Sequence, residues 1–485
     1  MKIIFSILLF ILSFSHAQTY FLLSDVQKKY IEYKLFSGEL IDHPLYQPYS
    51  DVKIANILIN DSTMLGQSIN LFINRSDTLI KVGTSINGFI GENNFLPSNE
   101  IGINIFGLYK ENNIISVFNY RADSKYQRDE VYFGSEGKFG SKVVGRITDS
   151  YIQYQKHKIK LFYGRQYQNY GIINSSSLIL SENPYSYDHF SFQYKTSYFR
   201  YSYLATRLED KISYDIRNDA IQNEWHKRYF SFHRLEIPIS NNLTFAFSES
   251  ILYGGRNQNF LPMYMNPLNI YFASKMVERK GLEETNANVL MAFDVLYKPK
   301  SNLVFYSQFL IDDMDFTKET RDRYPDRIGY LGKFVWLDPI PKTMLSVKII
   351  LMSNWTYNSY YTFGNYTYYG KSIGYPKNGI EKIELNVDTF LYDKSSVSMS
   401  IFLERERTQD LESHFIDQKT KFPIGVVQNV FGASVMLDYL YLQNSFISVY
   451  VDYLLFENYQ NSIGIDKTGF NFQLRFHHSI MKSLF

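Results

Sequence analysis

The sequence predicts an all-β fold: a transmembrane antiparallel β-barrel of about eighteen strands, with long extracellular loops and a small N-terminal segment. Three observations predict it. Aromatic residues make up 17% of the chain, runs of about ten residues alternate apolar with polar side chains, and short turns alternate with long connections. Aromatic side chains favour strands, and membrane barrels concentrate them at both lipid–water interfaces.

The N-terminus has the order of a secretory signal peptide. Met1-Lys2 supplies a positive start, an apolar run follows over residues 3–14, and Ser15-His16-Ala17 gives a small-x-small pattern. That order predicts a cleaved signal over residues 1–17. The apolar run is too short to cross a bilayer as a helix, and no later segment reaches the roughly 18 apolar residues that a helical span needs. An exported chain of this kind is either a soluble envelope protein or a barrel.

Charge and cysteine content exclude several partners and chemistries. The chain has 50 basic and 48 acidic residues and a net charge of +2, so no nucleic-acid partner is expected. It contains no cysteine, which excludes disulfides, thiolate metal sites and cysteine nucleophiles.

Residues 18–77 differ from the remainder of the chain. Within residues 20–38, Val26, Tyr30 and Leu35 are separated by charged residues, a spacing that favours a short amphipathic helix. We interpret residues 18–77 as a small periplasmic segment or a plug in the barrel lumen.

Residues 78–485 are predicted to form the barrel. Alternating runs such as 348–357, 396–405 and 445–454 are separated by clusters of Asn, Asp, Gly and Ser. Their length matches a tilted membrane strand of about 9–11 residues. The alternation suits a wall with lipid on one side and a polar lumen on the other.

The connections between these runs fall into two classes. Short turns are expected at residues 111–113, 298–302 and 394–395, which indicates antiparallel hairpins. Long connections are expected over residues 169–188, 207–225, 253–288, 312–326, 357–379 and 407–422. Tight periplasmic turns and extended external loops are the asymmetry of outer-membrane barrels.

The last run is typical of a final barrel strand. Phe470, Phe472, Leu474 and Phe476 alternate with polar residues, and the sequence ends in Phe485. An amphipathic last strand with a terminal aromatic residue is a common feature of outer-membrane barrels. It predicts assembly through the barrel-insertion machinery and a Gram-negative outer-membrane location.

Motifs for catalysis, cofactors and metals are absent from the sequence. It has no GxSxG elbow, P-loop or HExxH, and His477-His478 lacks other spaced ligands for a metal. We therefore expect no catalytic residue, no cofactor and no metal, and we do not expect an enzyme.

Charged residues within the strands are the remaining candidates for a site. Asp312 and Asp313 end a predicted strand, so they should face opposite sides and cannot form a catalytic pair. They form either a solvated loop mouth or a contact of one carboxylate with a lumen arginine or a sugar hydroxyl. Arg165 and Glu249 lie in alternating strands and should face the lumen, because arginine or lysine toward lipid costs about 2–4 kcal/mol at mid-bilayer.

Several blocks of the sequence resemble one family. GRQYQNYG at residues 164–171 and SSSLILSENP at 175–184 resemble a strand and loop of the Wzi-like capsule assembly outer-membrane proteins, a group that includes RemB-like gliding-motility proteins. Further similar blocks occupy residues 249–255, 261–267, 309–313 and 366–375, within about 130–400. The resemblance implies Arg165, Gln166, Glu249, Asp312 and Asp313 as motif positions that line the lumen without a catalytic role.

The family resemblance implies a non-enzymatic surface protein that attaches or assembles a capsular polysaccharide, or one that serves motility or adhesion. Outer-membrane lipid and a surface polysaccharide are the expected partners. Tyr357 and Tyr361 offer aromatic faces for sugar rings, although an interfacial aromatic girdle would also explain them. A passive porin or solute channel is the alternative function, expected if the lumen stays open.

Overall fold

The computed structural model describes residues 23–38, 45–47, 51–58, 61–70, 78–93, 99–124, 144–215, 220–256, 258–278, 287–313, 326–359, 361–391, 394–407, 411–412 and 425–484. The predicted signal peptide, residues 1–17, and the terminal Phe485 lie outside this set.

Strands dominate the described residues. The helices are α2 (Asp25–Ser37), α3 (Asp51–Ile57), α4 (Met64–Asn70), α5 (Pro262–Met265) and α6 (Tyr271–Glu278), with short 3-10 turns η4 (Thr362–Gly364) and η5 (Tyr459–Asn461). The strands are β1 (Thr78–Asn93), β2 (Asn99–Glu111), β3 (Ile114–Asp123), β4 (Val144–Lys156), β5 (Ile159–Gln166), β6 (Tyr187–Lys195), β7 (Arg200–Arg207), β8 (Lys211–Asp215), β9 (Ala220–Ser240), β10 (Leu243–Gly255), β11 (Asn288–Lys300), β12 (Leu303–Asp313), β13 (Arg327–Leu337), β14 (Thr343–Met352), β15 (Thr367–Tyr368), β16 (Lys371–Ser372), β17 (Ile380–Thr389), β18 (Ser395–Glu406), β19 (Gln428–Leu442), β20 (Ser445–Glu457) and β21 (Lys467–Ser483).

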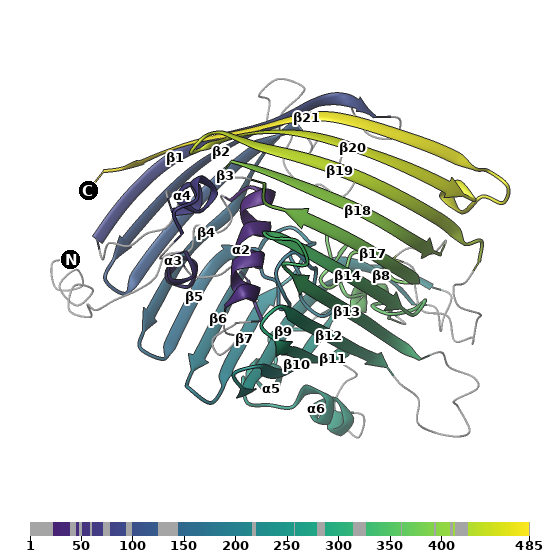
Figure 1. Ribbon diagram of the computed structural model, residues 1–485. Coiled ribbons are helices and arrows are strands. Elements are labelled where there is room, and N and C mark those ends of the chain that lie inside the picture. The colour runs from purple at the N-terminus through teal and green to yellow at the C-terminus, as the bar shows by residue number, and fades with distance from the viewer. Residues whose placement is uncertain are drawn as a thin grey trace.

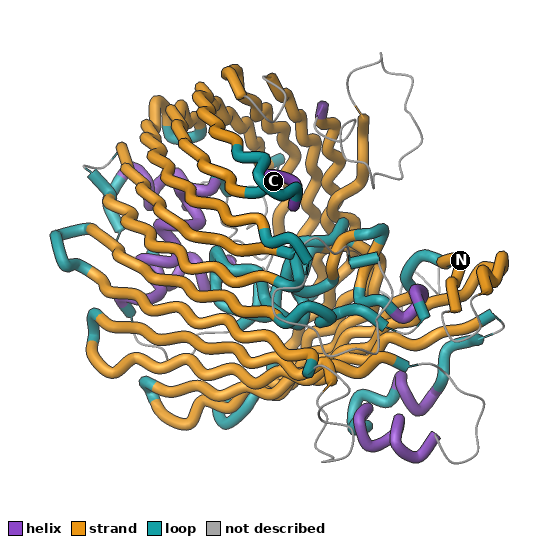
Figure 2. The backbone as a smooth tube through the Cα atoms, turned by 90° about the vertical axis from the view of Figure 1, so that its right-hand side faces the viewer, coloured by secondary structure: helices purple, strands orange, loops and turns teal. Residues whose placement is uncertain are grey.

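The large sheet closes on itself into a barrel (Figures 1 and 2). Its strands pair antiparallel with their neighbours around the ring, and β21 pairs with β1 to complete the circle. Of the 19 described strands in this sheet, β8 pairs with β9 beyond the end of β7. The wall therefore has 18 positions, and the predicted barrel of about eighteen strands is confirmed.

The strands alternate as the sequence predicts. On β21, Phe470 is 52% exposed and Phe472 43% exposed, whereas Asn471 between them is 4% exposed. The apolar side chains therefore face outward to form the lipid-facing belt, and the polar side chains face the lumen.

The two ends of the barrel differ. Short turns at one end join β2 to β3, β4 to β5 and β19 to β20. Asn112 takes a φ of +51° in the first of these turns, a left-handed conformation that asparagine tolerates well. The other end carries the long connections, so it is the extracellular end. The expected loop over residues 207–225 is wrong in part, because β8 and the start of β9 form a hairpin there that extends the wall.

Helix α2 lies inside the barrel, where Figure 1 shows it crossing the lumen. Ser24 starts it with a capping box, since its hydroxyl accepts from the Gln27 N–H and the Gln27 side chain accepts from the Ser24 N–H. Tyr30, Ile31 and Leu35 are buried against α3, α4 and the wall. None of the described helices is long and apolar enough to span a membrane.

Candidate functional site

Two long extracellular connections fold inward and pack in the lumen. The β5–β6 loop (residues 167–186) buries Ile172 and Leu178 completely. The β14–β17 loop (residues 353–379, with 360 outside the described set) carries the β15–β16 hairpin and buries Tyr366. Because apolar side chains of both loops join those of the inner wall in one cluster, these loops form a packed core inside the barrel.

The two inner loops are bonded to each other. The Ser181 N–H donates to the carbonyl of Ile373 at 2.8 Å, and the Tyr366 hydroxyl donates to the carbonyl of Ile179 at 2.7 Å. A Cβ on Gly374 would lie 2.2 Å from the carbonyl oxygen of Leu178. Only glycine therefore permits this close approach without a shift of the backbone.

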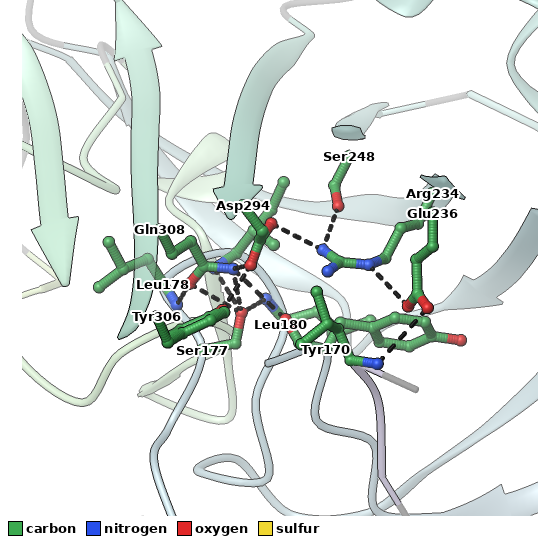
Figure 3. Close-up of polar contacts among 12 residues, drawn as sticks. Tyr170, Ser177, Leu178, Leu180, Arg234, Glu236, Ser248, Asp294, Tyr306 and Gln308 are labelled. Carbon is green, nitrogen blue, oxygen red and sulfur yellow. Dashed lines mark hydrogen bonds and ion pairs between the residues drawn. The ribbon is translucent and has the colours of Figure 1, made fainter. Parts of the chain in front are cut away.

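A polar network on the wall holds the β5–β6 loop (Figure 3). The Gln308 side chain on β12 accepts from the Leu178 N–H at 2.6 Å and donates to Asp294 at 2.9 Å. Asp294 also accepts from Arg234 at 2.8 Å, and Arg234 donates to Glu236 at 3.1 Å. These wall side chains are fully or almost fully buried, so the network is shielded from bulk water and fixes the loop in one position.

Two arginines on the wall hold the β14–β17 loop. Arg228 on β9 is 0% exposed and donates to the carbonyls of Phe363, Asn365 and Thr367 at 2.7–2.8 Å. It also pairs with Glu209 at 2.8 Å. A guanidinium with five N–H donors suits such a set of acceptors.

Arg327 on β13 makes the second attachment. It donates to the carbonyl of Asn358 at 2.6 Å and pairs with Asp313 at 2.6 Å. Asp312 accepts from the backbone N–H of Tyr357 at 2.7 Å. Tyr357 has a φ of +78°, so these contacts stabilise an otherwise unfavourable conformation.

Helix α2 fills the periplasmic part of the lumen. Glu32 accepts from Lys333 on β13 at 2.5 Å and from Asn174 of the β5–β6 loop at 2.8 Å. Lys29 pairs with Asp388 on β17 at 2.8 Å. The helix is thus bonded both to the wall and to an inner loop.

A polar cavity of about 850 Å³ remains between the inner loops, α2 and one side of the wall. Its lining includes Asn87, Asn104, Arg121, Gln166, Asp438 and Arg475. The volume lies within the range of about 300–1,000 Å³ that is usual for small-molecule sites. Glu182 of the β5–β6 loop also lines the cavity, where its side chain is exposed.

The strand register shows how this cavity runs. At the β20 wall it reaches Phe446, the second residue after the periplasmic turn, whereas at β5 it reaches Gln166, the last residue before the extracellular loop. From Phe446 the lining follows the pairing to His477 on β21 and then to Asn87, the tenth residue of β1 from its periplasmic end. Further lining residues lie on β2, β3 and β4. The cavity therefore climbs along the wall from the periplasmic toward the extracellular end.

The sequence of residues 104–449 matches the model of the capsule assembly protein Wzi family. The chain belongs to this family. Its structure is similar to that of Wzi from Escherichia coli, an outer-membrane carbohydrate-binding β-barrel involved in group 1 capsule assembly. Identity is 13% and the TM-score is 0.60, over 93% of this chain and 98% of that one.

OpdQ of Pseudomonas aeruginosa is also similar, at 10% identity and a TM-score of 0.46, over 85% of this chain and 100% of that one. The comparison with curated proteins finds no match. Family and fold together indicate the outer membrane of a Gram-negative bacterium, with lipid around the wall.

Three of the residues singled out by sequence lie inside the barrel. Gln166 is 2% exposed and lines the cavity. Asp312 is 7% exposed and holds the β14–β17 loop, where Tyr357 is fully buried. Tyr357 therefore packs in the lumen core and lies in no interfacial girdle. Its buried environment raises the pKa of its hydroxyl.

Two charged residues expected in the lumen face outward instead. Arg165 lies two residues after Tyr163, on the same outer face of β5, and Tyr163 is 70% exposed. Arg165 pairs with Asp188 at 2.6 Å at the extracellular rim. Glu249 alternates with Ser248, which bonds to Arg234 inside the barrel. The cost of a charge that faces lipid does not decide either position, because Asp188 pairs with Arg165 and backbone N–H groups of α6 donate to Glu249.

Asp313 and Tyr361 lie near the extracellular mouth. Asp313 is largely exposed and shares Arg327 with Asp312, although the two carboxylates stand on opposite faces. A register irregularity between Ile311 and Asp313 brings both within reach. Tyr361 is partly exposed.

Arg228 and Gln308 were not identified from the sequence. Each is a polar residue on a strand that otherwise alternates regularly, which is unremarkable in a barrel with a polar lumen. Their role becomes visible only with the inner loops in place. Among the described residues, no group of three or more His, Asp or Glu side chains is arranged to hold a metal.

Proposed function

We propose that this protein is a non-enzymatic outer-membrane barrel that attaches or assembles a surface polysaccharide. Family membership and the similarity to a carbohydrate-binding barrel support the polysaccharide role. The observation that carries the proposal is the packed lumen: Arg228, Arg327 and Gln308 fix two loops across it. A wall built in this way presents a fixed extracellular surface to a ligand.

Tyr361 is the proposed contact for a sugar ring. It stacks on Phe363 with ring centroids 5.6 Å apart, and Phe363 stacks on His226 at 4.7 Å and an interplanar angle of 2°. Three rings in contact form a rigid platform beside the extracellular mouth. Aromatic faces pack against the apolar faces of sugars, while a tyrosine hydroxyl bonds to their edges.

Binding of polysaccharide tests this assignment. Capsular polysaccharide purified from the surface of the same cells would be titrated onto detergent-solubilised protein, with dextran as the control polymer. We expect Tyr361→Ala to weaken binding and Tyr198→Ala to leave it unchanged, since Tyr198 is 80% exposed but lies in a short turn at the periplasmic end. Equal binding by both variants would remove Tyr361 from the site.

Gene deletion separates a capsule role from one in motility or adhesion. Loss of capsule retention in the deletion strain, restored by the wild-type gene, would support attachment or assembly. Loss of cell spreading with normal capsule would support a surface-motility role instead. Normal behaviour in both assays would refute the proposal.

A narrow solute path is the second candidate function, and the climbing cavity favours it. Phe446 and Gln166 mark its two ends, and the carboxylate of Asp438 and the guanidiniums of Arg121 and Arg475 give its lining mixed charge. A path of this kind would pass small polar solutes. Swelling of protein-containing liposomes in small sugars tests it, because an impermeable barrel gives no swelling.

Insertion through the barrel-assembly machinery is part of the same proposal. The amphipathic strand β21, with apolar residues outward and Asn471 and Gln473 buried toward the lumen, supports it. Depletion of that machinery should lower the amount of heat-modifiable protein in the outer membrane.

A further inference from the structure

The extracellular connection between β10 and β11 folds back over the outside of the barrel. Helices α5 and α6 lie outside the wall in Figures 1 and 2. The alternation of side chains along β7, β9 and β10 shows which of them point away from the lumen. Leu204, Phe232 and Ala246 belong to the lumen cluster, so their sequence neighbours Tyr203, His233 and residue 247 point outward.

Outward-facing side chains hold this covering segment, which we define as residues 258–278. The Tyr203 hydroxyl donates to the carbonyl of Met265 at 2.7 Å. Glu249 accepts from the backbone N–H groups of Tyr271 at 2.8 Å and Phe272 at 2.6 Å. Glu249 thereby receives two of the unpaired N–H donors at the start of α6, where a carboxylate is favoured.

A second layer of contacts closes the site around Glu249. His233 lies 3.1 Å from its carboxylate and stacks on Tyr271 with ring centroids 4.6 Å apart. Tyr229, Ile251, Tyr253, Tyr264 and Val289 complete an apolar cluster between the wall and the segment. Glu249 is 1% exposed as a result.

The height of Glu249 places the segment within the membrane zone. Glu249 is the seventh residue of β10, counted from the periplasmic turn at Leu243. At about 3.3 Å per residue and a tilt of about 40°, it lies roughly 15 Å above that turn, inside an apolar band about 25 Å tall. The segment that covers it reaches the level of the outer leaflet.

The segment exposes several large apolar side chains. Leu268 is 82% exposed, Ile270 61% and Phe272 42%. The wall below it carries exposed apolar side chains in the same sector, including Phe293 and Val295. Where the segment covers the wall, its own exposed apolar side chains therefore take the place of the wall in the lipid-facing belt.

We propose that residues 258–278 are an interfacial anchor whose Leu268, Ile270 and Phe272 side chains insert among the acyl chains of the outer leaflet. The anchor seals the buried Glu249–His233 pair from lipid on its inner side. The outer side of the anchor faces lipid in place of the parts of β9, β10 and β11 that the anchor covers. An apolar segment laid along the interface in this way gains stability from the area it buries in lipid.

Fluorescence of single-cysteine variants tests the anchor, because the native chain has no cysteine. Leu268→Cys carries an environment-sensitive dye, and the full chain is reconstituted in phosphatidylcholine vesicles that contain an acyl-chain quencher lipid. Ile463→Cys is the matched control, since Ile463 is 81% exposed in the β20–β21 connection. Ile401→Cys, on the outer face of β18 and 49% exposed, is the lipid-facing reference.

The proposal expects a blue-shifted emission and strong quenching at position 268, close to the values at 401, with weak quenching at 463. Values at 268 that equal those at 463 would overturn it. So would weak quenching at 268 together with disulfide cross-links between copies of the unlabelled Leu268→Cys variant under a mild thiol oxidant, because a second copy would then cover this face. Heat-modifiable migration confirms that each variant has folded before the dye is read.

Discussion

Replacing Arg228 with glutamine should release the β14–β17 loop from the barrel wall. The wild-type guanidinium is fully buried and bonds to three loop carbonyls as well as to Glu209. Removing one partner of a buried ion pair costs about 3–5 kcal/mol, because the other charge stays buried and unpaired. The wall keeps its ladder hydrogen bonds, so the cost falls on the docking of the loop.

That energy corresponds to a rise of roughly 150- to 5,000-fold in the population with a released loop. The assay is single-channel recording in planar bilayers, in which Arg228→Gln should show openings that the wild type lacks. Arg207→Gln is the matched control, since Arg207 is 51% exposed and pairs with the partly exposed Asp210. A surface pair of this kind contributes about 0–1 kcal/mol. Identical traces for the two variants would refute the assigned role of Arg228.

Three further predictions follow from the packing. Gly374→Ala should force the inner loops apart, which costs about 1–3 kcal/mol of unfolding free energy and lowers the midpoint of thermal unfolding. Gly107→Ala is the control, because nothing lies within 4 Å of the added Cβ and the midpoint should not change. Equal midpoints for the two variants would contradict this. Glu249→Ala removes two bonds to α6, so acyl-chain quenching of a dye at position 268 should fall, and unchanged quenching would show that Glu249 does not hold the segment. Burial alone would raise the pKa of Asp61, but hydrogen bonds from Tyr30 and Thr63 and the nearby Lys34 lower it. The contact between α2 and α4 is therefore stable above about pH 4, the usual aspartate range, and should loosen below it as Asp61 is protonated. Limited proteolysis across this range measures the loosening, which Asp61→Asn should abolish.

The wall was predictable from the sequence because its signal is local. Alternation along β21 follows directly from Phe470, Asn471 and their neighbours, and the periplasmic turns carry residues such as Asn112 that accept a left-handed conformation. The residues of each strand alone therefore distinguish its lipid-facing side from its lumen-facing side. The count of about eighteen followed from repeated use of that local pattern.

The lumen core was not predictable in the same way. Ile172, Leu178 and Leu180 lie in a segment expected as an extracellular loop, and their apolar character was the available sign that it folds inward. Docking depends on contacts such as Gln308 to Leu178, which are distant in sequence. No local pattern encodes those pairings.

Glu249 shows why alternation alone cannot assign the lumen face. Alternation separates the two faces of a strand but does not say which face is the lumen. We assigned charged side chains to the lumen because exposing a charge to lipid is costly. At Glu249 the covering segment removes that cost, because Tyr271 and Phe272 donate to the carboxylate. A charge on the outer face is therefore stable wherever the chain covers it.

The most direct test of the account is the conductance of the wild-type barrel in planar bilayers. The inner loops, fixed by Arg228, Arg327 and Gln308, occupy the lumen together with α2. We therefore expect no large stable openings in wild-type protein. Large, stable openings in most insertions would contradict it and would identify the protein as an open pore.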